Sequence, residues 1–291
     1  MPRIDVIVAV RNEEQNIPVF LGQFAALTLP ADVALNVLFV EDSSTDATRP
    51  LLRRLARNNP AIGYWTLARG AGQGLAIAFG LSRSTADAMI MMDVDGSHPV
   101  EVIPEMIRAY RDGAQVVQCV RRTLANRKEY RRIGAMAFQL AARALTGVDT
   151  NEQNIYYRLV TANVARSLLQ PRYWHYLRFP LPRRPEGALR RIYVDTEERV
   201  LGESKYDFRR LVNLAIDAVM SLMTGARLVV VFSIVGAIAL LLIAVGLWPL
   251  ALLVAAGMGW LLRRWIALHR TDTLQRMQVL ESANVPNRSD G

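Results

Sequence analysis

Two aspartates, Asp93 and Asp95, lie one residue apart at the end of a short apolar run, residues 88–92. Turn-forming residues follow at 96–99, so the run predicts a buried strand that stops at the carboxylates. Side chains at i and i+2 of an extended segment point to the same side, where two carboxylates repel each other unless a cation joins them. Mg²⁺ and Mn²⁺ prefer oxygen ligands and are commonly held by one or two carboxylates plus substrate phosphates. The pair indicates a divalent-metal site for a nucleotide diphosphate; the alternative is a solvated Asp-x-Asp turn.

Apolar runs alternate with helical patterns in the first part of the chain. The runs predict strands at 4–10, 35–40, 62–67 and 88–92, and the segments between them predict helices at 15–27, 47–57, 75–81 and 100–111. Strands that alternate with helices of about a dozen residues are typical of a doubly wound, mostly parallel α/β sheet. Further on, strands are expected at 115–120 and 192–197, a helix at 129–145 and an irregular polar stretch at 149–158.

In such a sheet the loops after successive strands meet at one edge, where open α/β sheets bind ligands. That edge would bring together the segments 11–14, 41–46, 69–74 and 93–99. Asp42 is suited to accept hydrogen bonds from a base or a ribose. The glycines at 70, 72 and 74 would let the backbone approach a ligand and would lead into a helix N-terminus, which favours phosphate. In the alternative interpretation Asp42 and its neighbours are helix caps and the glycines form an ordinary turn.

Charge and cysteine content restrict the partners. The 291 residues carry a formal net charge of +9, with a pI near 10.2, which indicates an anionic partner such as nucleic acid or an acidic membrane surface. Nucleic acid is disfavoured because the basic residues cluster beside segments that face a membrane. The single cysteine, Cys119, cannot form an intrachain disulfide, which fits a reducing compartment. The chain opens directly into a strand without a signal-peptide pattern, so we expect its α/β part to be cytoplasmic.

The C-terminal part has the composition of a membrane anchor. Residues 228–262 contain no charge, and a Gly-Leu-Trp-Pro break at 246–249 predicts a hairpin of two membrane-spanning helices within 227–268. An amphipathic helix at 206–226 would lie in the interface before the hairpin. Arginines flank both ends of the hairpin, so both ends are expected in the cytoplasm, including a polar and mobile tail at 269–291 to which no site is assigned.

These features together resemble a known family. The residues Arg11-Asn12-Glu13-Glu14-Gln15-Asn16, Glu41-Asp42-Ser43-Ser44-Thr45-Asp46, Gly72-Gln73-Gly74-Leu75-Ala76, Asp93-Val94-Asp95 with His98-Pro99, and Arg199 to Tyr206 carry the likeness. They are similar to motifs of the family 2 inverting glycosyltransferases of GT-A fold, and within that family to the polyprenyl-phosphate glycosyltransferases that include dolichol-phosphate mannose synthases. The segment Arg-x-x-Gly-Glu-Ser-Lys-Tyr at 199–206 is the most specific of these.

The resemblance implies a role for individual residues. Contacts to the nucleotide sugar are implied for Ala9, Arg11, Glu13, Asp42, Gly72, Gln73, Gly74, Asp93, Val94 and Asp95. The metal, Mg²⁺ or Mn²⁺, would be bound by Asp93, Asp95 and Ser97. The acceptor phosphate would be bound by Arg121, Arg131, Arg199, Ser204 and Lys205, and catalysis would rest on Asp93, Asp95, Arg121, Arg131, Arg199 and Lys205. For the basic segment that starts at Arg121, a solvated helix face is the alternative.

The implied activity is the transfer of a sugar from a GDP- or UDP-linked donor to a polyprenyl monophosphate at the cytoplasmic face of a membrane. The implied organisation is a GT-A catalytic domain at 1–205, the interfacial helix, the hairpin and the tail, with a homo-oligomer compatible with it. Two alternatives stay open at this stage. A sugar nucleotidyltransferase would release pyrophosphate and would leave the hairpin unexplained, and a non-catalytic adaptor for acidic lipids would make the aspartate pair accidental.

Overall fold

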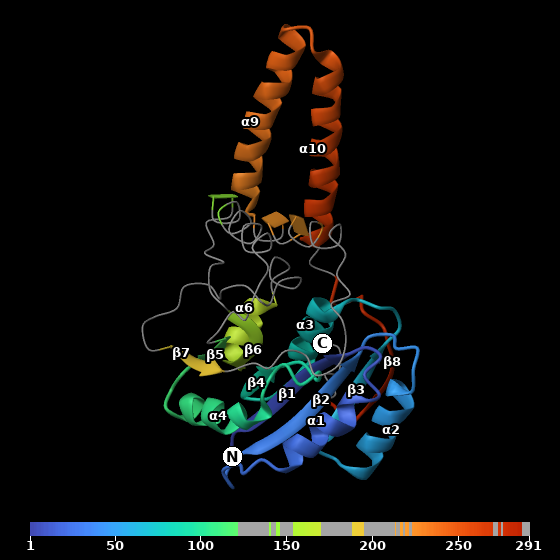
Figure 1. The fold of residues 1–291 in the computed structure, drawn as a ribbon, viewed down its shortest axis with the longest axis vertical. Coiled ribbons are helices and arrows are strands. Elements are labelled where there is room, and N and C mark those ends of the chain that lie inside the picture. The colour runs from blue at the N-terminus through green and yellow to red at the C-terminus, as the bar shows by residue number, and fades with distance from the viewer. Residues whose placement is uncertain are drawn as a thin grey trace.

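The computed structural model describes residues 1–121, 140, 144–145, 154–169, 188–194, 213, 216–217, 219–220, 223–269, 273–274 and 276–286. In this part of the chain one eight-stranded mixed sheet has the order β7-β5-β6-β4-β1-β2-β3-β8 (Figure 1). Helices cover both faces of the sheet, and a long helical hairpin extends away from it. The architecture is the α/β sandwich with a hairpin that the sequence predicts.

The parallel half of the sheet positions the candidate site. It consists of β4 (Ala88–Met91), β1 (Arg3–Val10), β2 (Ala34–Glu41) and β3 (Ile62–Leu67), and each neighbouring pair is parallel. These strands are almost wholly buried, as expected for strands covered on both faces. Their carboxyl ends therefore meet at one edge, the edge that carries the predicted ligand loops.

Helices on the two faces enclose separate cores. One face packs against α1 (Asn16–Ala25), α2 (Thr48–Asn58) and α4 (Ile103–Arg111), the last entered through a 3₁₀ turn, η1 (Val100–Val102). The other face packs against α3 (Gln73–Arg83) and α6 (Ala162–Leu168). The apolar residues of each strand alternate between the two cores, so one sheet organises both.

The other half of the sheet departs from the expected pattern. β6 (Asn154–Thr161) lies between β4 and β5 (Val116–Arg121) and is antiparallel to both, whereas β7 (Leu189–Val194) is parallel to β5. The interpretation of 149–158 as irregular was therefore wrong from Asn154 onward. Arg158, a buried arginine at the centre of β6, interrupts the apolar alternation of this strand, so the sequence pattern did not indicate a strand there. The expected strand at 192–197 begins earlier, at Leu189, and its last three residues lie outside the described part.

The hairpin confirms the prediction from composition. α9 (Gly225–Ala244) and α10 (Trp248–Leu268) are both long and apolar enough, by length and composition, to cross a membrane. They are joined at Gly246, whose φ of +82° is left-handed and suits glycine. Side chains such as Leu240 and Leu253 are each 69% exposed, so the hairpin presents an apolar surface to its surroundings.

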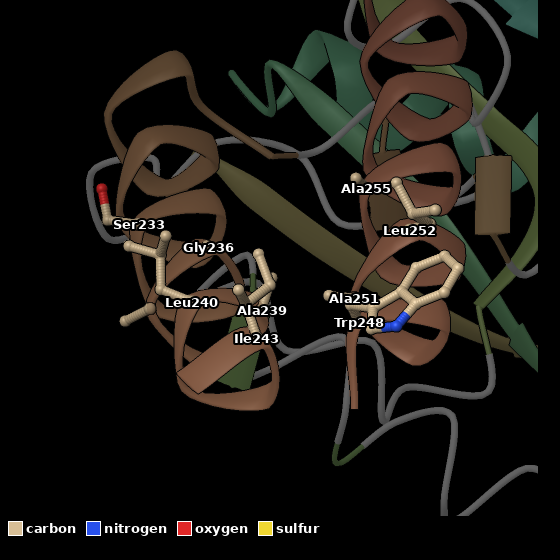
Figure 2. Close-up of a pocket in the computed structure, with 10 residues that line it drawn as sticks. Ser233, Gly236, Ala239, Leu240, Ile243, Trp248, Ala251, Leu252 and Ala255 are labelled. Carbon is tan, nitrogen blue, oxygen red and sulfur yellow. The ribbon is translucent and has the colours of Figure 1, made fainter. Parts of the chain in front are cut away.

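The two helices pack loosely in their distal half. Figure 2 shows Leu240 and Ile243 on α9 opposite Ala251 and Leu252 on α10, where they line an apolar groove between the helices. Ser233 and the indole N–H of Trp248 supply the polar side-chain groups among the residues that line it.

The base of the hairpin is tied to the segment before it. The side chain of Arg264 on α10 forms an ion pair with Asp217 and lies over the ring of Trp260, with 4.9 Å from Cζ to the ring centroid. Trp265 donates its indole N–H to the carbonyl of Met223 at 3.0 Å. Asp217 belongs to the interfacial helix expected at 206–226, most of which lies outside the described residues. Its side chain contacts α10 through Arg264.

The chain returns to the sheet after the hairpin, which the sequence did not predict. Residues 279–283 form β8 (Val279–Ala283), antiparallel to β3 at the sheet edge. Arg53 of α2 donates two hydrogen bonds to the carboxylate of Glu281, at 2.7 and 2.6 Å, and Tyr64 donates a third. Asn284, at a left-handed φ of +52°, donates to carbonyls that include those of Ala56 at 2.6 Å and Ile62 at 3.0 Å. The described part of the tail thus contributes a strand to the sheet.

This attachment predicts a pH dependence. The hydrogen bonds from Arg53 and Tyr64 lower the pKa of Glu281 from its ordinary 4.5 to about 2. Because the folded pKa is the lower one, the carboxylate stabilises the fold fully above pH 4.5, and this contribution is lost as the pH falls towards 2. The melting temperature of Glu281→Gln should lie below that of the wild type at pH 7, and the gap should close on acidification. An equal gap at both ends of the range would contradict the ion pair.

Candidate active site at the carboxyl edge of the sheet

The loops after β1 and β2 interlock. The amide of Asn12, at a left-handed φ of +56°, donates to Ser44 Oγ at 3.1 Å, and the amide of Thr45 donates to Asn12 Oδ1 at 2.8 Å. Glu13 is held in the same junction: its amide donates to Thr48 Oγ1 at 2.9 Å, and its Oε2 accepts from Asn16 Nδ2 at 2.6 Å. The predicted nucleotide residues Arg11 and Glu13 therefore sit on a loop that β2 keeps in place.

A buried carboxylate supports this junction from below. Glu41, fully buried at the end of β2, accepts a hydrogen bond from the amide of Ser44. Its other oxygen accepts from Arg49 Nε at 3.2 Å, which compensates the buried charge. The two neighbouring carboxylates therefore have different partners. Glu41 binds within the loop that follows β2, whereas Asp42 binds the loop that follows β3.

Asp42 holds the glycine loop that precedes α3. The residue is only 3% exposed, and its two carboxylate oxygens accept the amides of Ala71 at 2.6 Å and Gly72 at 2.9 Å. Gly72 has a φ of +84°, a conformation that side-chain-bearing residues rarely adopt, so glycine is required there. The sequence interpretation gave these acceptor oxygens to a base or ribose. The structure uses them to fix the β3–α3 loop, and a carboxylate has further lone pairs for a ligand.

The glycine loop also meets the loop after β1. A Cβ placed on Gly70 would lie 3.5 Å from Arg11 Nη1, so the exposed guanidinium is beside this loop. The amides at the start of α3 and the Arg11 cation therefore share one region of the edge. Both features favour an anion, as the phosphate interpretation of this loop requires.

Asp93 joins the glycine loop to β4. Gln73, the first residue of α3, donates its side-chain amide to Asp93 Oδ1. Two residues predicted for the nucleotide-sugar site, from segments twenty positions apart in sequence, are thus in direct contact. The backbone amide of Asp93 donates to Nδ1 of His98 at 2.8 Å, a residue to which the sequence analysis assigned no role.

The turn after Asp93 presents the second carboxylate. Asp95 is half-buried, its Oδ1 accepts the amide of Ser97 at 3.1 Å, and Gly96 between them has a φ of +78°. Val94 is 5% exposed and packs in the core beside α4, so its side chain is not available to a ligand. Ala9 is half-buried and packs against the core on the α3 face.

The acceptor-phosphate residues are not tested by this geometry. Arg131, Arg199, Ser204 and Lys205 lie outside the described residues, as does the side chain of Arg121. The backbone of Arg121 ends β5, opposite Val194 of β7. These residues remain predictions.

The donor set at the edge fits a hard divalent cation. Asp93 and Asp95 supply carboxylate oxygens at the end of a strand, and oxygen is the ligand type that Mg²⁺ and Mn²⁺ prefer. Within the part of the chain that the structure describes, no three His, Cys, Asp or Glu side chains are grouped to hold a metal. An ion bound by two carboxylates must complete its shell with water and substrate oxygens, as Mg²⁺ usually does beside phosphates.

Comparison with known proteins decides the family. A model of glycosyl transferase family 2 matches residues 5–173, a span that includes all the loops described above. The chain belongs to glycosyl transferase family 2. This family 2 chain is 31% identical, over 88% of its length and 76% of the relative's, to an undecaprenyl-phosphate 4-deoxy-4-formamido-L-arabinose transferase of Pseudomonas aeruginosa. It is 27% identical to a prophage bactoprenol glucosyl transferase homolog of Escherichia coli, over 76% of the chain and 72% of the relative.

Solved structures confirm the fold of the family 2 domain. The chain superposes on glucosyl-3-phosphoglycerate synthase from Mycobacterium tuberculosis, solved with Mn²⁺, UDP and glucosyl-3-phosphoglycerate, with a TM-score of 0.50 at 15% identity. The superposition covers 76% of this chain and 78% of that one. At this identity the likeness establishes the GT-A type fold that the motifs predicted and leaves the ligands to be argued from the chain's own residues.

Proposed function

We propose that this family 2 glycosyltransferase moves a sugar from a nucleotide-diphosphate sugar to a polyprenyl monophosphate at a membrane surface. The observation that carries the proposal is the 31% identity to an undecaprenyl-phosphate sugar transferase. It covers 88% of the chain and so extends well beyond the family domain at 5–173. The apolar hairpin supports the same acceptor, because a lipid-linked phosphate is presented at a membrane.

The donor would lie across the carboxyl edge of the sheet. In this arrangement the diphosphate faces Asp93 and Asp95, with Arg11 and the amides at the start of α3 beside it. A divalent ion held by the two aspartates would supply charge neutralisation for the leaving diphosphate. Gln73 orients Asp93, and Asp42 keeps the glycine loop in the shape that admits a phosphate.

The reaction needs two anions to meet. A phosphate oxygen of the acceptor forms a bond to the anomeric carbon of the sugar while the bond from that carbon to the diphosphate oxygen breaks, and the configuration inverts. Because the attacking oxygen is already anionic near neutral pH, a general base is not required. The protein's task is approach and charge compensation, for which Arg121, Arg131, Arg199, Ser204 and Lys205 are the proposed acceptor-phosphate residues.

The proposed organisation follows from this reaction. A catalytic domain at 1–205 works at the cytoplasmic face, the segment 206–226 lies in the interface, and the hairpin at 227–268 anchors the chain. The segment 269–291 is cytoplasmic in this scheme, which agrees with β8 being part of the catalytic sheet, since both must lie on the same side of the membrane.

The proposal is tested with membranes that contain the full chain. They are incubated with radiolabelled UDP- and GDP-linked sugars in turn, with Mg²⁺ or Mn²⁺, and the lipid fraction is extracted. We expect label from one of the donors to appear in the lipid fraction, and mild acid should release this label from the lipid. The corresponding nucleoside diphosphate should form as the second product. Membranes with Asp95→Ala serve as the control. A nucleotidyltransferase would label no lipid and, once pyrophosphate is added to the assay, would convert the nucleotide sugar to a sugar 1-phosphate and a nucleoside triphosphate instead.

A further inference from the structure

His98 lies beneath Asp93 at the end of β4 and is buried, with 5% of its surface exposed. Its Nδ1 accepts the backbone N–H of Asp93 at 2.8 Å. An imidazole nitrogen that accepts a hydrogen bond carries no proton, so the ring is the neutral tautomer with its proton on Nε2. That Nε2 lies 4.0 Å from Oδ2 of the same aspartate. One ring therefore faces both the backbone and the carboxylate of Asp93.

Tyr157 of β6 holds the imidazole from the other side. The two rings stack with their centroids 5.1 Å apart and their planes 15° from parallel. The phenol donates a hydrogen bond to the carbonyl of Pro99 at 3.0 Å, one residue beyond His98. Burial raises the pKa of Tyr157 well above its usual 10, which keeps the phenol protonated as a donor. The antiparallel strand that the sequence did not reveal thus supplies a support for the turn after β4.

The turn is consequently fixed at three places. Gln73 holds the Asp93 carboxylate from α3, His98 holds the Asp93 amide from within the turn, and Tyr157 fixes the turn's far end through Pro99. If His98 only filled space in the core, its Nδ1 would not need to accept the backbone N–H of Asp93. The direction of the hydrogen bond at Nδ1 is what distinguishes a positioning role from packing.

We propose that His98, supported by Tyr157, is a positioning residue that sets the orientation of Asp93 for the metal-bound diphosphate. The inference rests on the proposed function, because it takes Asp93 as the group that needs orientation. It adds two residues, neither of which touches the substrate, to the groups on which activity depends. Outer groups that orient a metal ligand typically change metal affinity by about 10–100-fold when they are lost.

Three substitutions separate orientation from packing. His98→Phe keeps a ring against Tyr157 and removes the acceptor, whereas His98→Asn loses the ring and keeps an oxygen close to the place of Nδ1. Tyr157→Phe keeps both rings and removes only the hydrogen bond to Pro99. The purified full chain in lipid nanodiscs is titrated with Mn²⁺ in the presence of UDP, and in parallel GDP, and bound Mn²⁺ is measured by electron paramagnetic resonance. Melting temperatures report the folding of each variant.

We expect His98→Phe to bind Mn²⁺ at least tenfold more weakly, His98→Asn to stay within about threefold of the wild type, and Tyr157→Phe to lie between them. In turnover assays kcat should fall in the same order, with the KM for the lipid acceptor unchanged. The reverse order, with phenylalanine better than asparagine, would show packing and overturn the proposal. If His98→Phe does not fold, Tyr157→Phe decides, and an unchanged Mn²⁺ affinity there overturns it.

The test also separates this inference from the proposed function. If no lipid becomes labelled but Mn²⁺ binding weakens in the expected order, the positioning role stands and the acceptor assignment fails. If lipid is labelled and all variants bind Mn²⁺ equally, the positioning role fails and the proposed reaction stands. A wild-type chain that binds no Mn²⁺ with either nucleotide overturns both the metal site and the role of His98.

Discussion

Replacing Asp95 with alanine is expected to lower the rate of sugar transfer about a thousandfold while the protein remains folded and bound to the membrane. Removal of one group that compensates charge in a transition state commonly costs a factor of about 100–1,000, and here the lost group is also half of the proposed metal site. Asp95 is half-buried in an exposed turn at the sheet edge, outside the apolar cores, and its Oδ1 accepts the amide of Ser97 at 3.1 Å. Its loss should therefore affect chemistry far more than stability.

The measurement is the initial rate of lipid labelling over a range of Mn²⁺ concentrations, beside the melting temperature. Asp32→Ala is a matched control, because Asp32 is an exposed carboxylate whose 2.9 Å ion pair with Arg111 is a surface contact away from the loops of the site. Such pairs contribute at most about 1 kcal/mol, so its rate should match the wild type. Full turnover of the wild type in the presence of a chelator would remove the metal from the proposal.

The parallel half of the sheet could be predicted because its signals are local. Strands such as Ala88–Met91 are continuous apolar runs that end near turn residues, and burial on both faces is what such runs require. The glycine loop and the Asp93–Asp95 pair follow their strands directly, so the topology alone brings them to one edge. The hairpin could likewise be predicted, since residues 228–262 carry no charge and a Gly-Leu-Trp-Pro break at 246–249 divides them into two apolar segments.

Contacts between segments distant in sequence could not be predicted. The nucleotide contact of Asp42 stays a prediction, but its hydrogen bonds from the amides of Ala71 and Gly72 could not be foreseen, because nothing in the neighbouring sequence shows that these amides reach its oxygens. β6 was missed because Arg158 breaks the alternation of a strand that is buried on both sides. β8 is a short edge strand with exposed apolar residues, and its pairing with β3 depends on where the hairpin returns the chain.

His98 shows the same limit at the level of one side chain. Its place five residues after Asp93 was visible in the sequence, but its function depends on the ring's tautomer and on Tyr157 from another strand. A buried histidine is equally compatible with packing when only the sequence is known. Only the structure shows that Nδ1 accepts the amide of Asp93 and that the ring stacks on Tyr157, and these contacts lead to the hypothesis that His98 orients Asp93.

Ending the chain after His269 should destabilise the catalytic domain by about 4 kcal/mol and lower its melting temperature by about 10 °C. The truncation keeps both helices of the hairpin and removes β8, its hydrogen bonds to β3 and the buried side chain of Leu274. It also removes Glu281, which binds Arg53, and Asn284, whose side-chain amide joins the end of α2 to β3. The exposed edge of β3 would become available to other chains, so the truncated protein should also aggregate sooner on heating.

The effect on activity should exceed the effect on stability. The carbonyl of Gln278 accepts the amide of Ala68 at 2.9 Å, at the point where β3 passes into the glycine loop. Release of this bond frees the loop that Asp42 must hold, so turnover should fall at least tenfold at temperatures well below melting. Asn284→Ala, which leaves β8 in place, should lose stability but retain turnover. A truncated chain that melts within 2 °C of the wild type and keeps its rate would show that the returning strand has no part in either.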